Sequence, residues 1–244
     1  SYTTRSVQNN IVLIINGSRQ VGKTFLLKVF GEKEYKKTAY FSLDRDRRTA
    51  AIFERGSSAH DLLLALSAIS NVDITAGDTL VILDVFCAIS FDEIQECPKA
   101  LEALKFFCED TSDIHIAVAG SLLGLSMQGG ASFPVGKVDE LPLYPMNFGE
   151  FLDAMGKEAL HQTLLSGNWP VISLLHEELI SLLRQYYFTG GMPGVVKVYA
   201  ESHELKQVRA LQKQILSDYR RDFSKHAPSR EVERINMVWD SIPS

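Results

Sequence analysis

The stretch that most constrains how this chain can fold is Gly17-Ser18-Arg19-Gln20-Val21-Gly22-Lys23-Thr24, which matches the phosphate-binding pattern G-x-x-x-x-G-K-[ST]. Residues 11–15 come before it as an apolar, mostly β-branched run, typical of a strand buried on both faces. Residues 25–30 follow it with apolar positions at helical spacing. The sequence therefore predicts a strand, a glycine-rich loop and a helix, whose backbone N–H groups and positive N-terminus surround a phosphate.

This loop predicts ATP and Mg²⁺ as cofactors. Lys23 is expected to contact the β- and γ-phosphates, and the Thr24 hydroxyl is expected to ligate the metal. The alternative is a chance glycine turn before an ordinary helix, and the strand and helix on either side argue against it. The candidate nucleotide-binding residues are Gly17, Ser18, Arg19, Gln20, Val21, Gly22, Lys23, Thr24 and Phe25.

Strand-like and helix-like segments alternate after this loop, which predicts an α/β fold with a parallel sheet and helices on both of its faces. Ser57-Ser58 followed by Asp61 resembles the capped start of a helix. Residues 140–145 are expected to form an edge strand, because their two prolines could not lie in a central one. The other expected elements are strands at 37–43, 79–84 and 114–119 and helices at 62–69 and 101–108.

The composition changes beyond about residue 150, where helical spacing dominates. The segments 174–187 and 205–223 are expected to form amphipathic helices, with Gly190-Gly191 as a turn or hinge between them. We therefore expect a P-loop domain at residues 1–150 and a helical extension at residues 151–244. The extension is expected to pack against the P-loop domain and to transmit its nucleotide state.

The bulk composition is that of a globular protein with a substantial core, at 45% apolar and 23% charged residues. No apolar run is long enough to span a membrane, and the N-terminus lacks the apolar segment of a signal peptide, so a cytoplasmic protein is expected. The three cysteines lack metal-site spacing and are interpreted as buried free thiols. A net charge of −5 gives no overall argument for nucleic-acid binding.

Several stretches together resemble the AAA-type P-loop ATPases of bacteria and archaea that carry a C-terminal domain of unknown function. The resemblance extends over nearly the whole chain from about residue 11. One departure is that the C-terminal domain is expected to be absent from this chain. The stretches that carry the resemblance are residues 16–24, 92–98 (DEIQECP), 119–121 (AGS), 143–152 (LYPMNFGEFL), 190–193 (GGMP) and 218–225 (DYRRDFSK).

The resemblance implies an ATPase in which the strand at 114–119 lies between the P-loop strand and the strand that supplies the metal carboxylate. Ser121 would then occupy the sensor position near the γ-phosphate, whereas a plain turn is the alternative for Gly120-Ser121. For an arginine finger from a neighbouring subunit, Arg220 and Arg221 are the candidates, and a solvated helix face explains them equally well. A homo-oligomer or a partner protein is therefore possible.

Two aspartates compete for the Walker B position, because both Asp84 and Asp92 end an apolar run. A single strand from residue 79 to residue 91 would be far longer than the usual five or six residues, so the chain must break between them. Counting forward from the turn at Gly77 favours Asp84, whereas Asp92 has Glu93 beside it to orient the attacking water. We expect Asp92 and Glu93 to fill these roles, with residues 85–91 as an insertion, and we keep Asp84 as the alternative.

Two other functions stay open. The disturbed Walker B region favours a binding module that ATP occupancy regulates with little hydrolysis. The basic residues of the C-terminal segment favour a nucleic-acid-binding protein, since residues 206–234 hold eight basic and four acidic side chains. Mixed signs at helical spacing are also typical of a solvated face.

Overall fold

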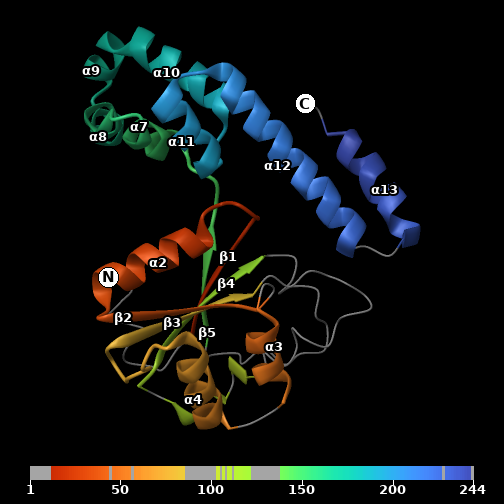
Figure 1. Ribbon diagram of the computed structural model, residues 1–244. Helices are drawn as coiled ribbons and strands as arrows, with labels where there is room; N and C mark the ends of the chain where they lie inside the picture. The colour runs from red at the N-terminus through yellow and green to blue at the C-terminus, as the bar shows by residue number, and fades with distance from the viewer. Residues whose placement is uncertain are drawn as a thin grey trace. The chain divides into compact units, whose positions relative to one another are not determined.

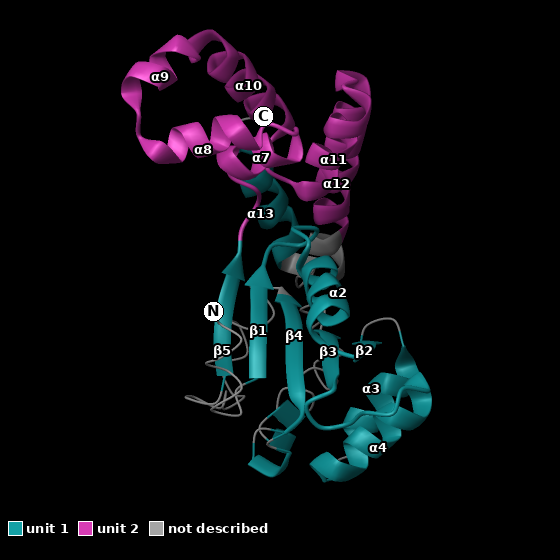
Figure 2. Cartoon of the chain, turned by 90° about the vertical axis from the view of Figure 1, so that its left-hand side faces the viewer, with its two compact units in different colours: residues 1–143, 222–244 teal, residues 144–221 magenta. Residues whose placement is uncertain are grey.

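A computed structural model describes residues 12–43, 46–55, 58–85, 103–104, 106–107, 109–111, 113–121, 138–226 and 229–242, with the backbone alone for Val85, Ser121, 222–226 and 229–230. The chain divides into two compact units: Ser1–Leu143 together with Asp222–Ser244 form unit 1, and Tyr144–Arg221 form unit 2 (Figure 2). These units describe packing and not independent folding. The division into domains at residue 150 therefore stays a prediction.

Unit 1 is built on a five-stranded parallel sheet with the strand order β2-β3-β4-β1-β5 (Figure 1). Strand β4 pairs with both β1 and β3. The expectation that an additional strand separates the P-loop strand β1 from β3 is therefore confirmed. The α/β fold class is confirmed with it. The strands are β1 (Val12–Gly17), β2 (Lys37–Ser42), β3 (Thr79–Val85), β4 (His115–Ser121) and β5 (Val138–Leu143).

The two faces of the sheet are covered by different helices, because the central strands are apolar on both faces. Helix α2 (Lys23–Glu34) packs Leu27 against one face. Helices α3 (Arg47–Glu54) and α4 (Ala59–Ser70) pack against the other face. The predicted start of α4 is confirmed, since the Ser58 hydroxyl caps it by accepting a hydrogen bond from the Asp61 backbone N–H at 3.2 Å.

Strand β5 lies at the edge of the sheet, as the prolines of residues 140–145 predict, and Pro142 lies within it. It begins at Val138 and ends at Leu143, slightly earlier than the expected range. Its pairing brings Leu143 opposite Gly17, the first glycine of the phosphate-binding loop. An added Cβ on Gly17 would overlap the carbonyl oxygen of Leu143, so only glycine fits at this position.

The C-terminal part of the chain is helical, which confirms the prediction for this region. The core of unit 2 gathers around Phe151, Val195, Val196 and Tyr199, with Val208 and Ile215 from the long helix α12. The helices are α7 (Phe148–Ala154), α8 (Glu158–Ser166), α9 (Trp169–Leu174), α10 (His176–Thr189), α11 (Pro193–Ser202), α12 (Leu205–His226) and α13 (Ser229–Asp240).

Two motifs that are distant in sequence meet inside unit 2. The Met146 backbone N–H donates a hydrogen bond to the Gly191 carbonyl at 2.7 Å, and the Tyr186 hydroxyl donates to the Met146 carbonyl at 2.9 Å. A Cβ on Gly191 would overlap the Met146 carbonyl oxygen, so the turn needs glycine there. Gly190 has a φ of 68°, as expected of a glycine turn. The turn between α10 and α11 is therefore tied to the segment that follows β5.

Candidate nucleotide-binding site

The phosphate-binding loop connects β1 to α2, as the sequence predicts. Gly22 immediately precedes the helix in a left-handed conformation, with φ of 97°, and no side chain caps the first turn. Gln20 also has a positive φ, of 64°. The first turn of α2 holds no acidic residue. The N–H groups at this helix end therefore meet no competing side-chain carboxylate of their own helix, which suits the binding of an anion.

The Lys23 ammonium group lies against the loop itself. It donates hydrogen bonds to the Gly17 carbonyl at 2.9 Å and to the Ser18 carbonyl at 2.8 Å. Partial burial lowers the pKa of Lys23 from its ordinary value, and the negative charge of Asp84 acts in the opposite direction. The ammonium group is thus held at the mouth of the loop, where a phosphate could replace the two carbonyls as its partner.

The Thr24 hydroxyl and a carboxylate from β3 form the centre of the site. Thr24 Oγ1 donates a hydrogen bond to Asp84 Oδ2 at 2.8 Å, and the Tyr40 hydroxyl donates to the same oxygen at 2.9 Å. The Lys28 Nζ atom lies 3.7 Å from the centroid of the Tyr40 ring. Two hydroxyl donors from α2 and β2 therefore orient one carboxylate on β3.

The sheet register explains why these side chains meet. Asp84 lies opposite Ser42 of β2 and Ala119 of β4, near the carboxyl end of its strand. Side chains alternate between the two faces of a strand, and Asp84 shares its face with Leu80 and Ile82, which pack under α2. Asp84 therefore lies at this strand end beside Thr24, and because Asp92 lies outside the described residues, the choice between the two aspartates as the metal carboxylate stays a prediction.

The structure does not describe the side chains of three predicted site residues, Asp92, Glu93 and Ser121. Asp92 and Glu93 lie outside the described residues, as do the three cysteines. Ser121 is the last residue of β4, and its backbone pairs with Gly17, next to the phosphate-binding loop. Its role as a sensor stays a prediction. Phe25 follows Thr24 in the first turn of α2 and is 74% exposed.

The residues present fit Mg²⁺, which usually binds through one or two carboxylates together with the phosphates of a substrate. A hydroxyl has one proton and two lone pairs, so Thr24 can keep its hydrogen bond to Asp84 and still offer lone pairs to a cation. Across the described ranges, no group of three or more His, Cys, Asp or Glu side chains could hold a metal.

Three residues near the loop were not predicted from the sequence. Tyr40 contacts Asp84, and Asn16 donates from its Nδ2 atom to Glu140 Oε2 at 2.9 Å. The buried Oδ1 atom of Asn16 has no hydrogen-bond partner among the residues that the structure describes. A polar residue in an otherwise apolar strand, directly before the loop, was the signal for Asn16. For Tyr40, the alternation of side chains along β2 predicts which face of the sheet the ring lies on, but it does not predict Asp84 as the hydrogen-bond partner.

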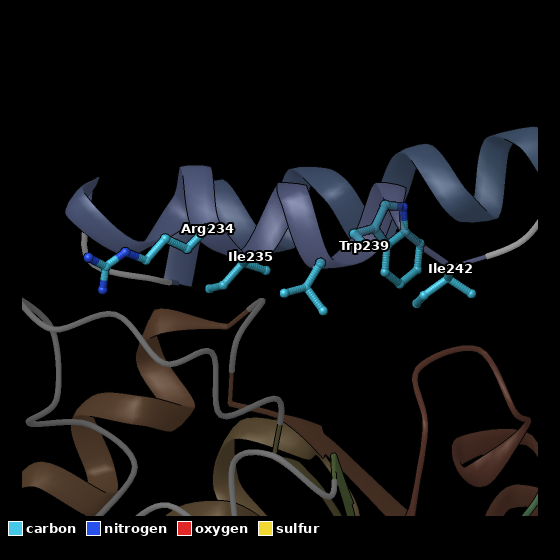
Figure 3. Close-up of a pocket in the computed structure, with 5 residues that line it drawn as sticks. Arg234, Ile235, Trp239 and Ile242 are labelled. Atoms are coloured by element: carbon cyan, nitrogen blue, oxygen red, sulfur yellow. The ribbon is translucent and has the colours of Figure 1, made fainter.

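A separate pocket of about 380 Å³ lies along α13 (Figure 3). Its lining is Arg234, Ile235, Val238, Trp239 and Ile242, and the labelled side chains project from one side of the helix. It includes no residue of the phosphate-binding loop. None of the helices in the described part of the chain is long and apolar enough to cross a membrane.

A family model described as "AAA domain" matches residues 9–152, which is more than half of the chain. The chain belongs to the AAA domain family. A second model, "Domain of unknown function (DUF8612)", matches residues 180–244. The expected absence of a C-terminal domain of unknown function is therefore not confirmed, since a segment of unknown function lies within this AAA protein. No curated protein matches the sequence.

Several solved structures are similar to this chain at low identity. A signal transduction ATPase with numerous domains (STAND) from Pyrococcus horikoshii, with a tetratricopeptide repeat sensor, is 16% identical over 90% of this chain and 34% of its own, with a TM-score of 0.45. The replication initiator DnaA bound to AMPPCP and single-stranded DNA is 17% identical over 91% of this chain and 65% of its own, with a TM-score of 0.43. The Drosophila ORC bound to DNA is 13% identical over 85% of this chain and 62% of its own, also with a TM-score of 0.43. The AAA protein thus spans less than two thirds of the length of each of these chains.

Proposed function

We propose that this AAA protein binds ATP with Mg²⁺ at the Gly17–Thr24 loop and hydrolyses the ATP. The single observation that carries the proposal is the hydrogen bond from Thr24 Oγ1 to Asp84 Oδ2, 2.8 Å long. It joins the end of a phosphate-binding loop to a carboxylate on a neighbouring strand. Phosphoryl transfer requires mainly positioned donors and a metal held between protein and phosphate, and this pair supplies the protein side.

Each residue has a distinct part in the proposed reaction. The loop N–H groups bind the phosphates, and Lys23 exchanges the Gly17 and Ser18 carbonyls for the β- and γ-phosphate oxygens. Thr24 and Asp84 would hold Mg²⁺, Asp84 directly or through a water molecule. The metal, when bound, neutralises charge on the phosphate oxygens. Glu93 is the proposed residue that orients the attacking water.

Tyr40 is proposed to position Asp84 and not to touch the substrate. Its hydroxyl donates to Asp84 Oδ2, and its ring lies beneath the Lys28 ammonium group, which favours one ring orientation. Partners that hydrogen-bond a metal-binding carboxylate commonly affect metal affinity by a factor of about 10–100. Tyr40 would therefore set the orientation in which Asp84 meets the metal.

The proposed coupling to unit 2 follows the chain. Gly17 pairs with Leu143, and the Leu143 carbonyl lies against the Gly17 Cα. The chain continues from Leu143 into Tyr144, Pro145 and Met146, and Met146 is bonded to Gly191. A displacement of the loop on nucleotide binding would thus reach the turn before α11 through three residues. This route supports the proposal that nucleotide state is passed to the helical part of the protein.

The experiment compares ATP binding by the wild type, Lys23→Ala and Lys33→Ala. Both substitutions remove one lysine from α2, but Lys33 lies in its last turn and is exposed. A hydrogen bond to a charged group contributes about 1.5–3 kcal/mol, so Lys23→Ala should weaken ATP binding about 10- to 100-fold. Lys33→Ala should bind as the wild type does. Equal ATP affinity in all three folded proteins would refute the proposed site.

A second candidate function is a nucleotide-regulated binding module that hydrolyses ATP slowly. The observation that favours it is the identity of the residue after Asp84, which is Val85 and not a glutamate. No carboxylate adjacent to Asp84 in sequence is therefore present to orient water. A turnover assay separates the two functions. ATP binding without measurable, Mg²⁺-dependent phosphate release would favour the binding module.

A further inference from the structure

The exposed side of helix α12 carries a line of basic residues, Lys206, Arg209, Lys213 and Arg220, which we name the basic stripe. All four side chains are exposed. The opposite side of the helix packs Val208 and Ile215 into the core of unit 2, with Leu211 and Tyr219 partly buried beside them. The helix therefore separates an apolar buried face from a basic exposed one within a single unit.

Helix geometry places the four basic residues on one narrow face. Each residue turns the helix by about 100°, so the four Cα positions lie within an arc of about 60° on the side away from Val208 and Ile215. From Lys206 to Arg220 the stripe extends about 21 Å along the axis, at 1.5 Å per residue. The four residues thus share one side of the helix, with spacings of three, four and seven residues.

The acidic residues of α12 lie off this row. By the same geometry, Asp218 and Asp222 lie more than about 90° around the helix from the centre of the stripe. Asp218 forms an ion pair with Arg221, which also lies off the stripe. Residues 205–221 hold five basic and one acidic side chain, a local charge of +4 in a chain of −5. The positive charge is therefore concentrated where the helix faces outward.

Arg209 is held in place on the stripe. Its guanidinium carbon lies 4.7 Å from the centroid of the Phe188 ring, and its Nη1 atom donates to Gln212 Oε1 at 3.1 Å. These contacts use one face and one donor of the guanidinium group, which has five donors in all. The remaining donors can meet an anion from an already ordered side chain, which lowers the entropy lost on binding.

We propose that the basic stripe binds the phosphate backbone of double-stranded DNA. Exposed lysines and arginines are the side chains that contact phosphates without regard to sequence. A duplex carries about one negative charge per 1.7 Å of its axis, so a row of about 21 Å faces many phosphates. The inference goes beyond the proposed ATP site and does not depend on it.

Two observations favour a duplex over other polyanions. Single-stranded nucleic acid is bound largely by stacking on exposed aromatic rings, and the one aromatic residue within 205–221 is Tyr219, which is partly buried against the core on the other side of the helix. An amphipathic helix on a membrane inserts its apolar face into lipid, whereas the apolar face of α12 is occupied by the core of unit 2. The stripe therefore offers charge without stacking or insertion.

The experiment measures binding of the full chain to a fluorescent duplex of about 20 base pairs by anisotropy, over a range of salt concentrations. Four phosphate contacts predict that log K falls with log [salt] at a slope of about −3.6, a weakening of about 100-fold between 50 and 200 mM. The double variant Lys206→Gln/Lys213→Gln removes two of the contacts and should reduce the slope to about −1.8. Neither lysine makes an ion pair or hydrogen bond within the described residues, so the fold should be retained.

The matched control is Lys157→Gln/Lys197→Gln, which removes the same charge from unit 2 away from the stripe. These lysines pair with Glu178 and Glu201. The control should keep the wild-type slope. The proposal is overturned if no duplex binding occurs at low salt, or if both double variants change the slope equally. It is also overturned if phosphatidylserine vesicles bind the protein more tightly than the duplex does and the stripe variant abolishes that binding.

Discussion

Tyr35 and Tyr40 lie at opposite ends of the same parallel sheet and use their hydroxyl groups in different ways. Near the amino ends of the strands, the Tyr35 hydroxyl is 2.8 Å from Nδ1 of His115, the first residue of β4. Near the carboxyl ends, the Tyr40 hydroxyl donates to Asp84 beside the phosphate-binding loop. Each tyrosine thus joins its segment to a strand, but only Tyr40 contacts a residue of the candidate site.

The two tyrosines differ because the Tyr35–His115 and Tyr40–Asp84 hydrogen bonds lie in different surroundings. Tyr35 lies edge-on to Phe30 and His115 in an aromatic cluster, and burial raises its pKa above the ordinary value. Nδ1 of His115 thereby has a hydrogen-bond partner in the Tyr35 hydroxyl. At the carboxyl end the loop, the start of α2 and Asp84 converge. Ligands of open α/β sheets bind at the carboxyl ends of the strands. In agreement with this, Tyr40 hydrogen-bonds the site residue Asp84 at that end, whereas Tyr35 hydrogen-bonds His115 at the other end.

The largest effect on ATP binding and stability is expected from Gly17→Ala, with Gly77→Ala at the other end of the sheet as its control. In Gly17→Ala the new Cβ overlaps the Leu143 carbonyl oxygen, so the loop must shift, at a cost of about 1–3 kcal/mol in the free energy of unfolding. ATP binding should weaken at least about tenfold, from the displaced loop N–H groups. Gly77→Ala, near the amino ends, meets open space and carries only the strain of its φ of 71°, about 1 kcal/mol. Denaturant unfolding and ATP titration of both variants measure these effects. If Gly77→Ala impaired ATP binding as much as Gly17→Ala does, the two ends of the sheet would not differ in function.

A smaller effect is expected for Tyr40→Phe. The ring and its contact with Lys28 remain, but Asp84 loses one of its two hydroxyl donors. The Mg²⁺ concentration needed for half-maximal ATP binding should rise about tenfold. ATP affinity without Mg²⁺ should stay the same. Isothermal titration at several Mg²⁺ concentrations measures both quantities, and an unchanged Mg²⁺ requirement would show that Tyr40 does not position Asp84.

Tyr35→Phe serves as the matched control at the other end of the sheet. It removes the hydrogen bond to His115 and should lower the free energy of unfolding by about 0.5–1.5 kcal/mol. The Mg²⁺ dependence of ATP binding should be that of the wild type. If Tyr35→Phe also changed the Mg²⁺ dependence, the two ends would not be functionally distinct.

The smallest effect concerns stability at alkaline pH, where the two ends have opposite signs. The pKa of Lys23 is lowered, so the unfolded chain holds this proton more tightly, and stability gains as pH rises from that lowered pKa towards 10.5. The pKa of Tyr35 is raised, so its contribution is present below 10.0 and is lost as pH rises through the folded value. Relative to the wild type, Lys23→Met should therefore lose stability as pH rises, and Tyr35→Phe should gain it. Urea unfolding between pH 8 and 11 would contradict this if both variants changed in the same direction.

Much of unit 1 could be predicted because its signals are local. The strand, loop and helix around Gly17–Thr24 lie together in the sequence, and the prolines near residue 142 exclude a central strand. The sequence left the choice between Asp84 and Asp92 open because the strand end depends on pairing with β2 and β4, which places Asp84 there. In the sequence, Glu93 beside Asp92 favoured Asp92 because a glutamate could orient the attacking water. In the structure, the register of β3 brings Asp84 next to Thr24. Tyr40 and the Met146–Gly191 contact depend on tertiary pairing in the same way.

The most direct test of the account compares Asp84→Asn with Asp92→Asn in Mg²⁺-dependent binding of a non-hydrolysable ATP analogue. Each substitution removes one negative charge and keeps the shape of the side chain. We predict that Asp84→Asn abolishes the gain in affinity that Mg²⁺ gives the wild type and that Asp92→Asn retains it, because Asp84 is the carboxylate bonded to Thr24. Loss of the Mg²⁺ effect in Asp92→Asn, with the effect intact in Asp84→Asn, would contradict the account.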